Sequence, residues 1–350
     1  MAFYTIHNVA VSGLTVCVPK NVEDNMSLPN FEPEEAKRII DSTGVKQKRV
    51  VDDHTTPSDL CTKAAERLME MMEWDRESID CLVFVSTNRD YLQPTTSCVI
   101  HNSLGLKESC FAIDVPCGCP GWVYGLYIMG TFLQTGQMKR GLLLVGDTST
   151  KMNYSLDKSA RPLFGDAGTA TAMEYKEGAP EMQFNIATIS SGWNEIITKE
   201  GGARTPFNEN SLKVEQGADG YLHRPIDCVM NGMNVFAFSL STPSKTIKQL
   251  VEQFAIDTQS IDYFLCHQAN KYIVDKIRKK AGFDAEKTPI CLDEFGNTSN
   301  ASIPLCIVSR CAESFEKQKQ NVLAVAFGTG LMCGVAHIQF DKLKNEMIEY

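Results

Sequence analysis

The chain has 350 residues, of which 43% are hydrophobic and 22% are charged, a composition typical of a globular protein with a substantial core. Its formal net charge of −9 argues against general nucleic-acid binding, which needs a basic surface. No apolar stretch approaches the length of a membrane span, and residues 1–20 lack the pattern of a secretion signal, so we expect no membrane contact.

The thirteen cysteines are scattered along the chain and odd in number. Without a secretion signal, this usage indicates the reducing cytoplasm. None of the cysteines forms a CxxC pair, and Cys117-Gly-Cys119 has no second pair at ligand spacing, so we predict no metal site.

The chain contains an internal repeat. Residues 61–80 and 243–262 share helical apolar spacing, and both stretches end in Ser-Ile-Asp. An apolar run typical of a buried strand follows each of them, and a second apolar run comes later in each half. We therefore predict equivalent helix–strand–strand units at 61–80, 81–88 and 141–150, and at 243–262, 263–270 and 321–330.

These units predict an α/β protein made of two similar halves, residues 1–175 and 176–350, with two packed sheets. Near-continuous apolar strands are typical of sheets that are covered on both faces. The segment 191–227 is polar and rich in Gly and Asn, and we expect a long surface loop or cap there.

Residues 111–115 read as a strand and residues 120–136 as a helix that is apolar almost all round, hence buried. Pro120 suits the first helical position. Cys119 then lies at the helix N-terminus, where free N–H groups favour a thiolate, whereas Cys117 lies in the preceding turn. The alternative is that both cysteines are small buried side chains without chemistry.

Two further segments carry candidate polar groups at the ends of predicted elements. His267 ends a buried strand in CHQAN (266–270), and Asn297 lies in the turn-rich stretch EFGNTSNASIP (294–304). Taken singly, a histidine here is more often structural than catalytic, and an asparagine is more often a cap or turn former.

Five motifs in this order resemble the β-ketoacyl-acyl carrier protein synthase III family of thiolase-fold condensing enzymes. They are DVxxxCxG (114–121), LFGDAGTA (163–170), HQAN (267–270), GNTSNASIP (296–304) and FGTGLMCG (327–334). The similarity runs over almost the whole chain. It implies a five-layered αβαβα fold with two mixed sheets, and it favours Cys119 over Cys117 as the nucleophile.

The resemblance also implies the chemistry. Cys119 would hold an acyl group taken from a thioester, and His267 with Asn297 would stabilise the enolate formed when a malonyl thioester loses carbon dioxide. The backbone N–H groups of Cys119 and Thr329 would form the oxyanion hole. The expected reaction is a decarboxylative Claisen condensation in fatty-acid initiation or a related pathway. Coenzyme A or phosphopantetheine thioesters are the substrates, and no metal or redox cofactor is expected.

Some positions depart from the family pattern near the expected substrate sites. Arg38 and Ser42 stand where family members that use acetyl-coenzyme A have Trp and Arg for the adenine. Gln93 stands where a phenylalanine closes the primer pocket across a dimer. This predicts a longer or more polar primer, unless Tyr91 or Leu92 fills the same space.

The helix that follows His267 is basic, and we expect it to dock an acidic acyl carrier protein, although a merely solvated helix face is the alternative. Its basic residues are Lys271, Lys276, Arg278, Lys279 and Lys280. A homodimer is also expected. Two rival functions stay open: acyl transfer to an oxygen or nitrogen acceptor, and a non-catalytic protein that binds acyl groups or serves as a heterodimer partner.

Overall fold

The computed structural model describes residues 2–217 and 220–350, so the predicted cap 191–227 is described except for 218–219. A six-stranded sheet has the order β17-β2-β8-β7-β5-β6. Its strands are β17 (Lys344–Glu349), β2 (Val9–Val18), β8 (Asp166–Tyr175), β7 (Arg140–Thr148), β5 (Cys81–Val85) and β6 (Phe111–Val115). Strand β5 runs parallel to β6 and β7, whereas β8 runs antiparallel to β7 and β2, so the sheet is mixed.

A five-stranded sheet has the order β1-β9-β16-β15-β14. Its strands are β1 (Ala2–Ile6), β9 (Met182–Thr188), β16 (Met332–Phe340), β15 (Gln320–Gly328) and β14 (Tyr263–Cys266). Strands β14 and β15 are parallel and the other pairs are antiparallel, so this sheet is mixed too. Three small ribbons pair β3 (Val22–Asp24) with β4 (Gln47–Arg49), β10 (Ile196–Ile197) with β13 (Val229–Met230), and β11 (Glu215–Gln216) with β12 (Leu222–His223).

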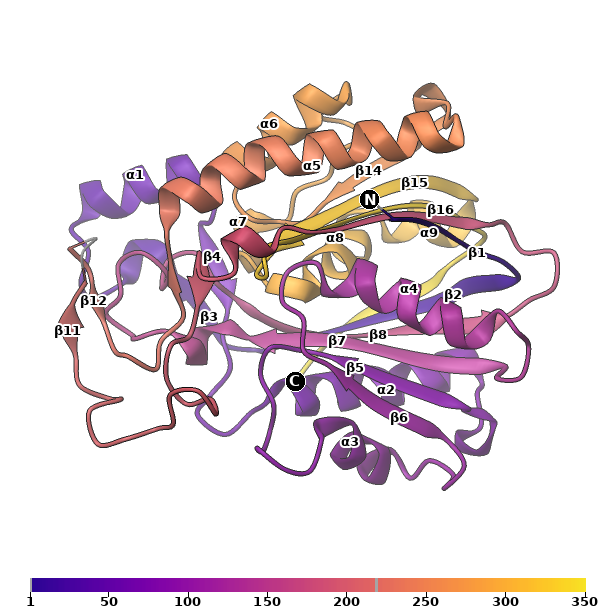
Figure 1. Cartoon of the computed structure of the whole chain (residues 1–350), viewed down its shortest axis with the longest axis horizontal. Helices are drawn as coiled ribbons and strands as arrows, with labels where there is room; N and C mark the ends of the chain where they lie inside the picture. The colour runs from indigo at the N-terminus through magenta and orange to yellow at the C-terminus, as the bar shows by residue number, and fades with distance from the viewer. Residues whose placement is uncertain (1, 218–219) are drawn as a thin grey trace.

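Helices form three layers around the two sheets, as Figure 1 shows. Helices α2 (Pro57–Met72) and α3 (Thr96–Leu104) cover the outer face of the six-stranded sheet, and α5 (Gly232–Phe254) and α6 (Lys271–Ala281) cover that of the five-stranded sheet. Between the sheets lie α4 (Gly121–Leu133) and α8 (Ser302–Arg310). The remaining helices are α1 (Pro33–Thr43), α7 (Leu292–Phe295) and α9 (Ala312–Lys317). The predicted five-layered αβαβα fold with two mixed sheets is confirmed.

The internal repeat is visible in the sheet order. Strands β2-β8-β7-β5 of one sheet correspond to β9-β16-β15-β14 of the other, with the same sequence of antiparallel and parallel pairings. The two halves exchange their end strands, because β1 joins the later sheet and β17 joins the earlier one. Strand β8 ends at Tyr175 and β9 begins at Met182, and the division into domains at 175/176 stays a prediction.

Some predicted boundaries differ from those of the structure by one to eleven residues. Pro120 is the N-cap of α4 rather than its first residue, and α4 ends at Leu133. The strands expected at 81–88 and 263–270 end at Val85 and Cys266. Helix α5 begins eleven residues before the expected start, because the Asn231 side chain accepts a hydrogen bond from the Asn234 N–H and caps it there.

Candidate active site

Loops from both halves meet at the buried N-terminal end of α4, where they line one cavity of about 410 Å³. Its walls include Cys119, His267, Asn297 and Thr329, so the structure brings the predicted reactive residues together. The lining is mostly apolar, with Ile196, Met230, Val235 and Phe327 among its side chains. A larger cavity, of about 710 Å³, is mostly polar and contains none of the predicted reactive residues.

Cys119 immediately precedes the α4 N-cap and lies against the end of β15. A Cβ atom placed on Gly328 would approach Cys119 Cβ to 2.7 Å and Sγ to 3.0 Å, so this position requires glycine. Burial raises the pKa of the Cys119 thiol to about 12, and the neighbouring Ser299 hydroxyl only partly opposes this. The expectation that the thiol pKa is lowered toward a thiolate is therefore wrong, because desolvation by burial is the largest influence on this group.

Cys117 does not line the cavity. It is buried in the central core, its carbonyl accepts a hydrogen bond from Asn300 Nδ2 (3.3 Å), and burial raises the pKa of its thiol to about 12. The structure assigns Cys117 to packing.

His267 follows β14 directly, and its backbone N–H donates to the Val325 carbonyl (2.8 Å), which extends the pairing with β15 by one residue. The side chain is 1% exposed, and its ring lies edge-on against Phe327. Burial lowers the pKa of His267 to about 3, opposed by a hydrogen bond with the backbone of Ser299. The imidazole is therefore neutral at physiological pH.

Asn297 is fixed by backbone pairing with the loop that precedes β8. Its N–H donates to the Leu163 carbonyl (2.9 Å), and its carbonyl accepts from the Gly165 N–H (3.1 Å). Its Oδ1 accepts from the Ser299 N–H (2.9 Å), and Nδ2 donates to the Ala269 carbonyl at 3.5 Å. Because Oδ1 is occupied, the amide is oriented, and the second Nδ2 hydrogen remains available for a ligand.

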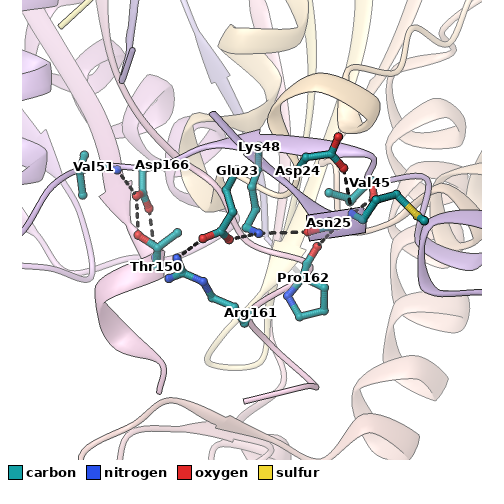
Figure 2. A network of polar contacts seen from close by, with 11 residues as sticks. Glu23, Asp24, Asn25, Val45, Lys48, Val51, Thr150, Arg161, Pro162 and Asp166 are labelled. Atoms are coloured by element: carbon teal, nitrogen blue, oxygen red, sulfur yellow. Dashed lines mark hydrogen bonds and ion pairs between the residues drawn. The ribbon is translucent and has the colours of Figure 1, made fainter. Parts of the chain in front are cut away.

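A partly buried ionic network, drawn in Figure 2, reaches the same loop at Arg161 and Pro162. Glu23 accepts from both Lys48 and Arg161, and Lys48 Nζ also donates to Asn25 Oδ1 (3.1 Å). Asn25 Nδ2 in turn donates to the Pro162 carbonyl (2.8 Å). The Lys48 side chain is 0% exposed, and burial lowers its pKa. The network ties the β3–β4 ribbon to residues 161–162, next to the segment that pairs with Asn297.

The two residues expected to form the oxyanion hole, Cys119 and Thr329, both line the cavity. Thr329 follows the last residue of β15 and lines the cavity beside Cys119. Within residues 2–217 and 220–350, neither of these two backbone N–H groups donates to another backbone carbonyl. The oxyanion hole at these two residues stays a prediction.

Sequence reasoning missed Ser299 and Asp147. Ser299 adopts φ of 53°, a strained value for a residue with a side chain, and its Oγ lies 3.8 Å from Cys119 Sγ. Asp147, fully buried at the end of β7, accepts from Ser86 Oγ, Thr87 N–H and Thr87 Oγ1, all at Oδ1. Burial raises its pKa, and its charge raises the pKa of Cys119. In the sequence, only the small polar residues of GNTSNASIP (296–304) and GDTST (146–150) indicated that Ser299 and Asp147 lie near the site.

The predicted docking helix is α6, beside the cavity. Lys271, Lys276, Lys279 and Lys280 are exposed on it. Arg278 is not, because its Nε donates to Asp275 (2.8 Å) along the helix. Tyr272 stacks on Phe236 of α5, whose side chain lines the cavity, so an apolar surface joins the lysines to the cavity.

The residues expected at the primer pocket do not line the cavity of their own chain. Tyr91 and Leu92 are 60% and 75% exposed, Gln93 is exposed beside them, and Tyr91 lines the larger polar cavity. Arg38 and Ser42 lie exposed on α1, whose C-cap Gly44 packs against Lys271. Across the described ranges, no cluster of three or more metal-ligating side chains forms, and no helix is long and apolar enough to cross a membrane.

Comparisons with known proteins identify the family of the chain. A family model described as 3-oxoacyl-[acyl-carrier-protein] synthase III matches residues 113–191, and the model of its C-terminal part matches 251–340. The β-ketoacyl-[acyl-carrier-protein] synthase III of Symbiobacterium thermophilum is 30% identical, and the alignment covers 96% of this chain and 99% of that protein. The corresponding synthase of Streptococcus pneumoniae is also 30% identical, over 95% of this chain and 98% of that one.

Solved structures lead to the same family. A 3-oxoacyl-(acyl-carrier protein) synthase from Burkholderia xenovorans is 33% identical and superposes with a TM-score of 0.94, covering 100% of this chain and 99% of that one. A second structure, of a 3-oxoacyl-(acyl-carrier-protein) synthase III, is 30% identical with a TM-score of 0.90, over 95% of this chain and 100% of that one. The chain belongs to the 3-oxoacyl-[acyl-carrier-protein] synthase III family of condensing acyltransferases.

Proposed function

We propose that this protein condenses an acyl thioester primer with a malonyl group on acyl carrier protein, through an acyl-Cys119 intermediate. The observation that carries the proposal is the convergence of Cys119, His267 and Asn297 on one largely apolar cavity. This arrangement offers one nucleophile and two neutral hydrogen-bond donors, and no group in the set is a strong base. It suits chemistry in which negative charge develops on a thioester oxygen.

In the first half-reaction, Cys119 Sγ attacks the thioester carbonyl of the primer. The new acyl–Sγ bond replaces the bond to the carrier's sulfur, and the proton of the Cys119 thiol ends on the departing thiol. The N–H groups of Cys119 and Thr329 bind the oxyanion of the tetrahedral intermediate. A preformed pair of donors of this kind accelerates acyl transfer by about 10²–10³ per donor.

In the second half-reaction, the malonyl carboxylate leaves as carbon dioxide, and its electron pair becomes an enolate. His267 Nε2–H and the free Asn297 Nδ2 hydrogen stabilise the enolate oxygen. The enolate carbon attacks the acyl carbonyl, Cys119 leaves and takes up a proton, and the 3-oxoacyl product stays on the carrier. No metal or redox cofactor takes part in this scheme.

The substrates are thioesters of coenzyme A or phosphopantetheine, and the malonyl donor is bound to acyl carrier protein. Exposed lysines on α6 are complementary to an acidic carrier protein, and the adjacent Tyr272–Phe236 surface leads toward the cavity. We take the docking surface to be Lys271, Lys276, Lys279 and Lys280 with Tyr272, and leave out Arg278 because it pairs with Asp275.

The primer differs from acetyl-coenzyme A in this proposal. Arg38 and Ser42, on the exposed surface of α1, offer no aromatic ring for an adenine. Besides its apolar walls, the cavity near Cys119 has Thr87, Ser149, Thr198 and Cys228 in its lining, so it accepts a primer with some polar character.

A homodimer is part of the proposal. Strand β6 is the edge of the six-stranded sheet, so its outer backbone groups can pair with a second copy. The exposed side chains of Tyr91 and Leu92 precede α3 in the loop between β5 and β6. Burying these apolar groups against a partner supports the same dimer and puts them within reach of the partner's primer site. All thirteen cysteines are free thiols, which supports a cytoplasmic location.

The test supplies a panel of acyl-coenzyme A and acyl-carrier thioesters together with malonyl-carrier protein. Carbon dioxide release and the mass of the carrier are measured. A 3-oxoacyl carrier with one carbon dioxide per product is the expected result. An acylated oxygen or nitrogen acceptor without carbon dioxide would overturn the proposal in favour of simple acyl transfer, and the absence of turnover with every primer would favour a non-catalytic protein.

A further inference from the structure

A buried hydroxyl, that of Ser302, lies against the His267 ring and has no role in the proposed chemistry. Ser302 is the first residue of α8, is 0% exposed, and lies behind His267 rather than in the cavity lining. Its Oγ is 2.7 Å from His267 Nδ1, and the ring also has a hydrogen bond with the backbone of Ser299. The contact joins the histidine after β14 to a helix that packs between the two sheets.

The direction of this hydrogen bond follows from the other neighbours of Ser302. The Gln268 backbone N–H donates to Ser302 Oγ at 3.4 Å, so the oxygen already accepts one hydrogen bond. Among the described contacts, His267 Nδ1 is the only acceptor for the hydroxyl hydrogen. If Nδ1 carried the proton and donated to Ser302 instead, the serine hydrogen would be buried without a partner.

The side chain of Gln268 keeps this arrangement in place. Its Nε2 donates to the Cys266 carbonyl (2.7 Å), and its Oε1 accepts from the Cys291 N–H (3.2 Å). Gln268 is 0% exposed, so the backbone N–H that binds Ser302 belongs to a residue that is bonded at both ends. The hydroxyl therefore has a fixed position relative to the histidine ring.

We propose that Ser302 is a positioning residue that donates to His267 Nδ1 and thereby holds the imidazole as the Nε2–H tautomer. A neutral imidazole carries one N–H, and in this tautomer the hydrogen lies on the nitrogen opposite Ser302. In the condensation proposed above, on which this consequence rests, His267 then acts as a hydrogen-bond donor to the enolate and not as the base that deprotonates Cys119.

The contrast with a carboxylate partner shows why a hydroxyl suits this role. An aspartate or glutamate at the same place accepts from Nδ1–H, fixes the opposite tautomer and presents an Nε2 lone pair, as in a general-base histidine. Ser302 Oγ already accepts a hydrogen bond from a backbone N–H, so its hydroxyl donates to Nδ1 and leaves the ring hydrogen on Nε2. The identity of the residue behind the ring thus separates a donor histidine from a base histidine.

The direct test observes the tautomer. Histidine labelled with ¹⁵N is incorporated, and the His267 signal is assigned by its loss in His267→Gln. In the wild type, we expect Nε2 at the protonated shift and Nδ1 at the unprotonated shift throughout pH 6–8. An Nδ1–H tautomer in the wild type would overturn the proposal, whatever the enzyme's activity, so this result is separable from failure of the proposed function.

The functional test divides the reaction into its halves for Ser302→Ala, with Ser302→Thr as the matched control that keeps the hydroxyl. Ser302→Ala should lower carbon dioxide release from malonyl-carrier protein about 10- to 100-fold, approaching loss of one oxyanion donor. Acylation of Cys119 should stay within about twofold, and Ser302→Thr should recover most of the decarboxylation. Equal loss of both half-reactions in a folded Ser302→Ala protein, or no loss of either, would contradict the positioning role.

Discussion

Equivalent strand ends in the two halves carry different chemistry. Val85 at the end of β5 corresponds to His267 directly after β14, because the repeat offset of 182 aligns 81–88 with 263–270. Val85 packs against α4 beside Gly121, and the next residues, Ser86 and Thr87, bind the Asp147 carboxylate. His267 instead faces the cavity.

The next strand pair shows the same division. Asp147, near the end of β7, corresponds to Gly328 on β15, because Cys81 pairs with Gly141 and Tyr263 with Val322. The residue before Gly328 is Phe327, against which the His267 ring lies. The earlier half supplies the nucleophile and a buried carboxyl, whereas the later half supplies neutral donors and an apolar wall. Duplication thus provides two similar sheets, and the reaction depends on different residues at the ends of their equivalent strands.

The largest effect is expected on decarboxylation, when a hydrogen-bond donor of the later half is removed. His267→Ala and Asn297→Ala should each lower decarboxylation by about 10²–10³, because each removes one donor to the enolate oxygen. The earlier half is intact, so acyl-Cys119 should still form to the wild-type extent. Carbon dioxide release and intact mass measure the two steps.

The control for these variants is His54→Ala, since His54 is exposed and lies outside the cavity. Its activity should equal that of the wild type. If His267→Ala also abolished acylation, the division of labour between the halves would be wrong.

The next effect concerns the network behind Asn297. Glu23→Gln should lower the free energy of unfolding by about 2 kcal/mol, because Lys48 and Arg161 then lose their shared anion while Lys48 stays buried. Lys48→Met should lower the free energy of unfolding by less, since Glu23 keeps its ion pair with Arg161 and the methionine fills a similar volume. Urea unfolding monitored by circular dichroism compares the two variants. A larger loss for Lys48→Met would contradict this account.

The pH dependence of acylation tests the earlier half. Since the pKa of Cys119 is raised to about 12, the thiolate fraction rises about tenfold per pH unit below that value. The acylation rate should therefore increase from pH 6 to 9 without a plateau. His267, with a pKa lowered to about 3, stays neutral over this range and should add no inflection. Stopped-flow acylation rates give the profile, and a plateau near pH 7 would show that the helix terminus outweighs burial.

The smallest effect concerns the surface beside the later half. Lys279→Glu with Lys280→Glu should weaken the use of carrier-bound substrates several-fold at low ionic strength and leave small thioesters unaffected. The matched control is Lys63→Glu, because α2 lies on the opposite outer layer. The ratio of kcat/KM for carrier-bound and small thioesters is the measurement, and an equal loss for both substrate types would contradict docking at α6.

The sequence singled out Cys119, His267 and Asn297 because each lies in a contiguous motif at the end of an element, and the structure brings the three residues to one cavity. It could not predict Ser299 and Ser302 as neighbours of Cys119 and His267, since these contacts join residues 180 and 35 positions apart. The pKa of Cys119 was predicted with the wrong sign. A helix N-terminus can be read from local sequence, but the desolvation that opposes it depends on packing by β15 and the Ser299 turn, which only the folded chain brings together.

The most direct test of the central claim is the intact mass of the protein after incubation with the thioester panel. The wild type and Cys117→Ala should each gain one acyl group, and Cys119→Ala should gain none. An adduct that persists in Cys119→Ala, or one that is lost in Cys117→Ala, would contradict the assignment of Cys119 as the residue that carries the acyl group.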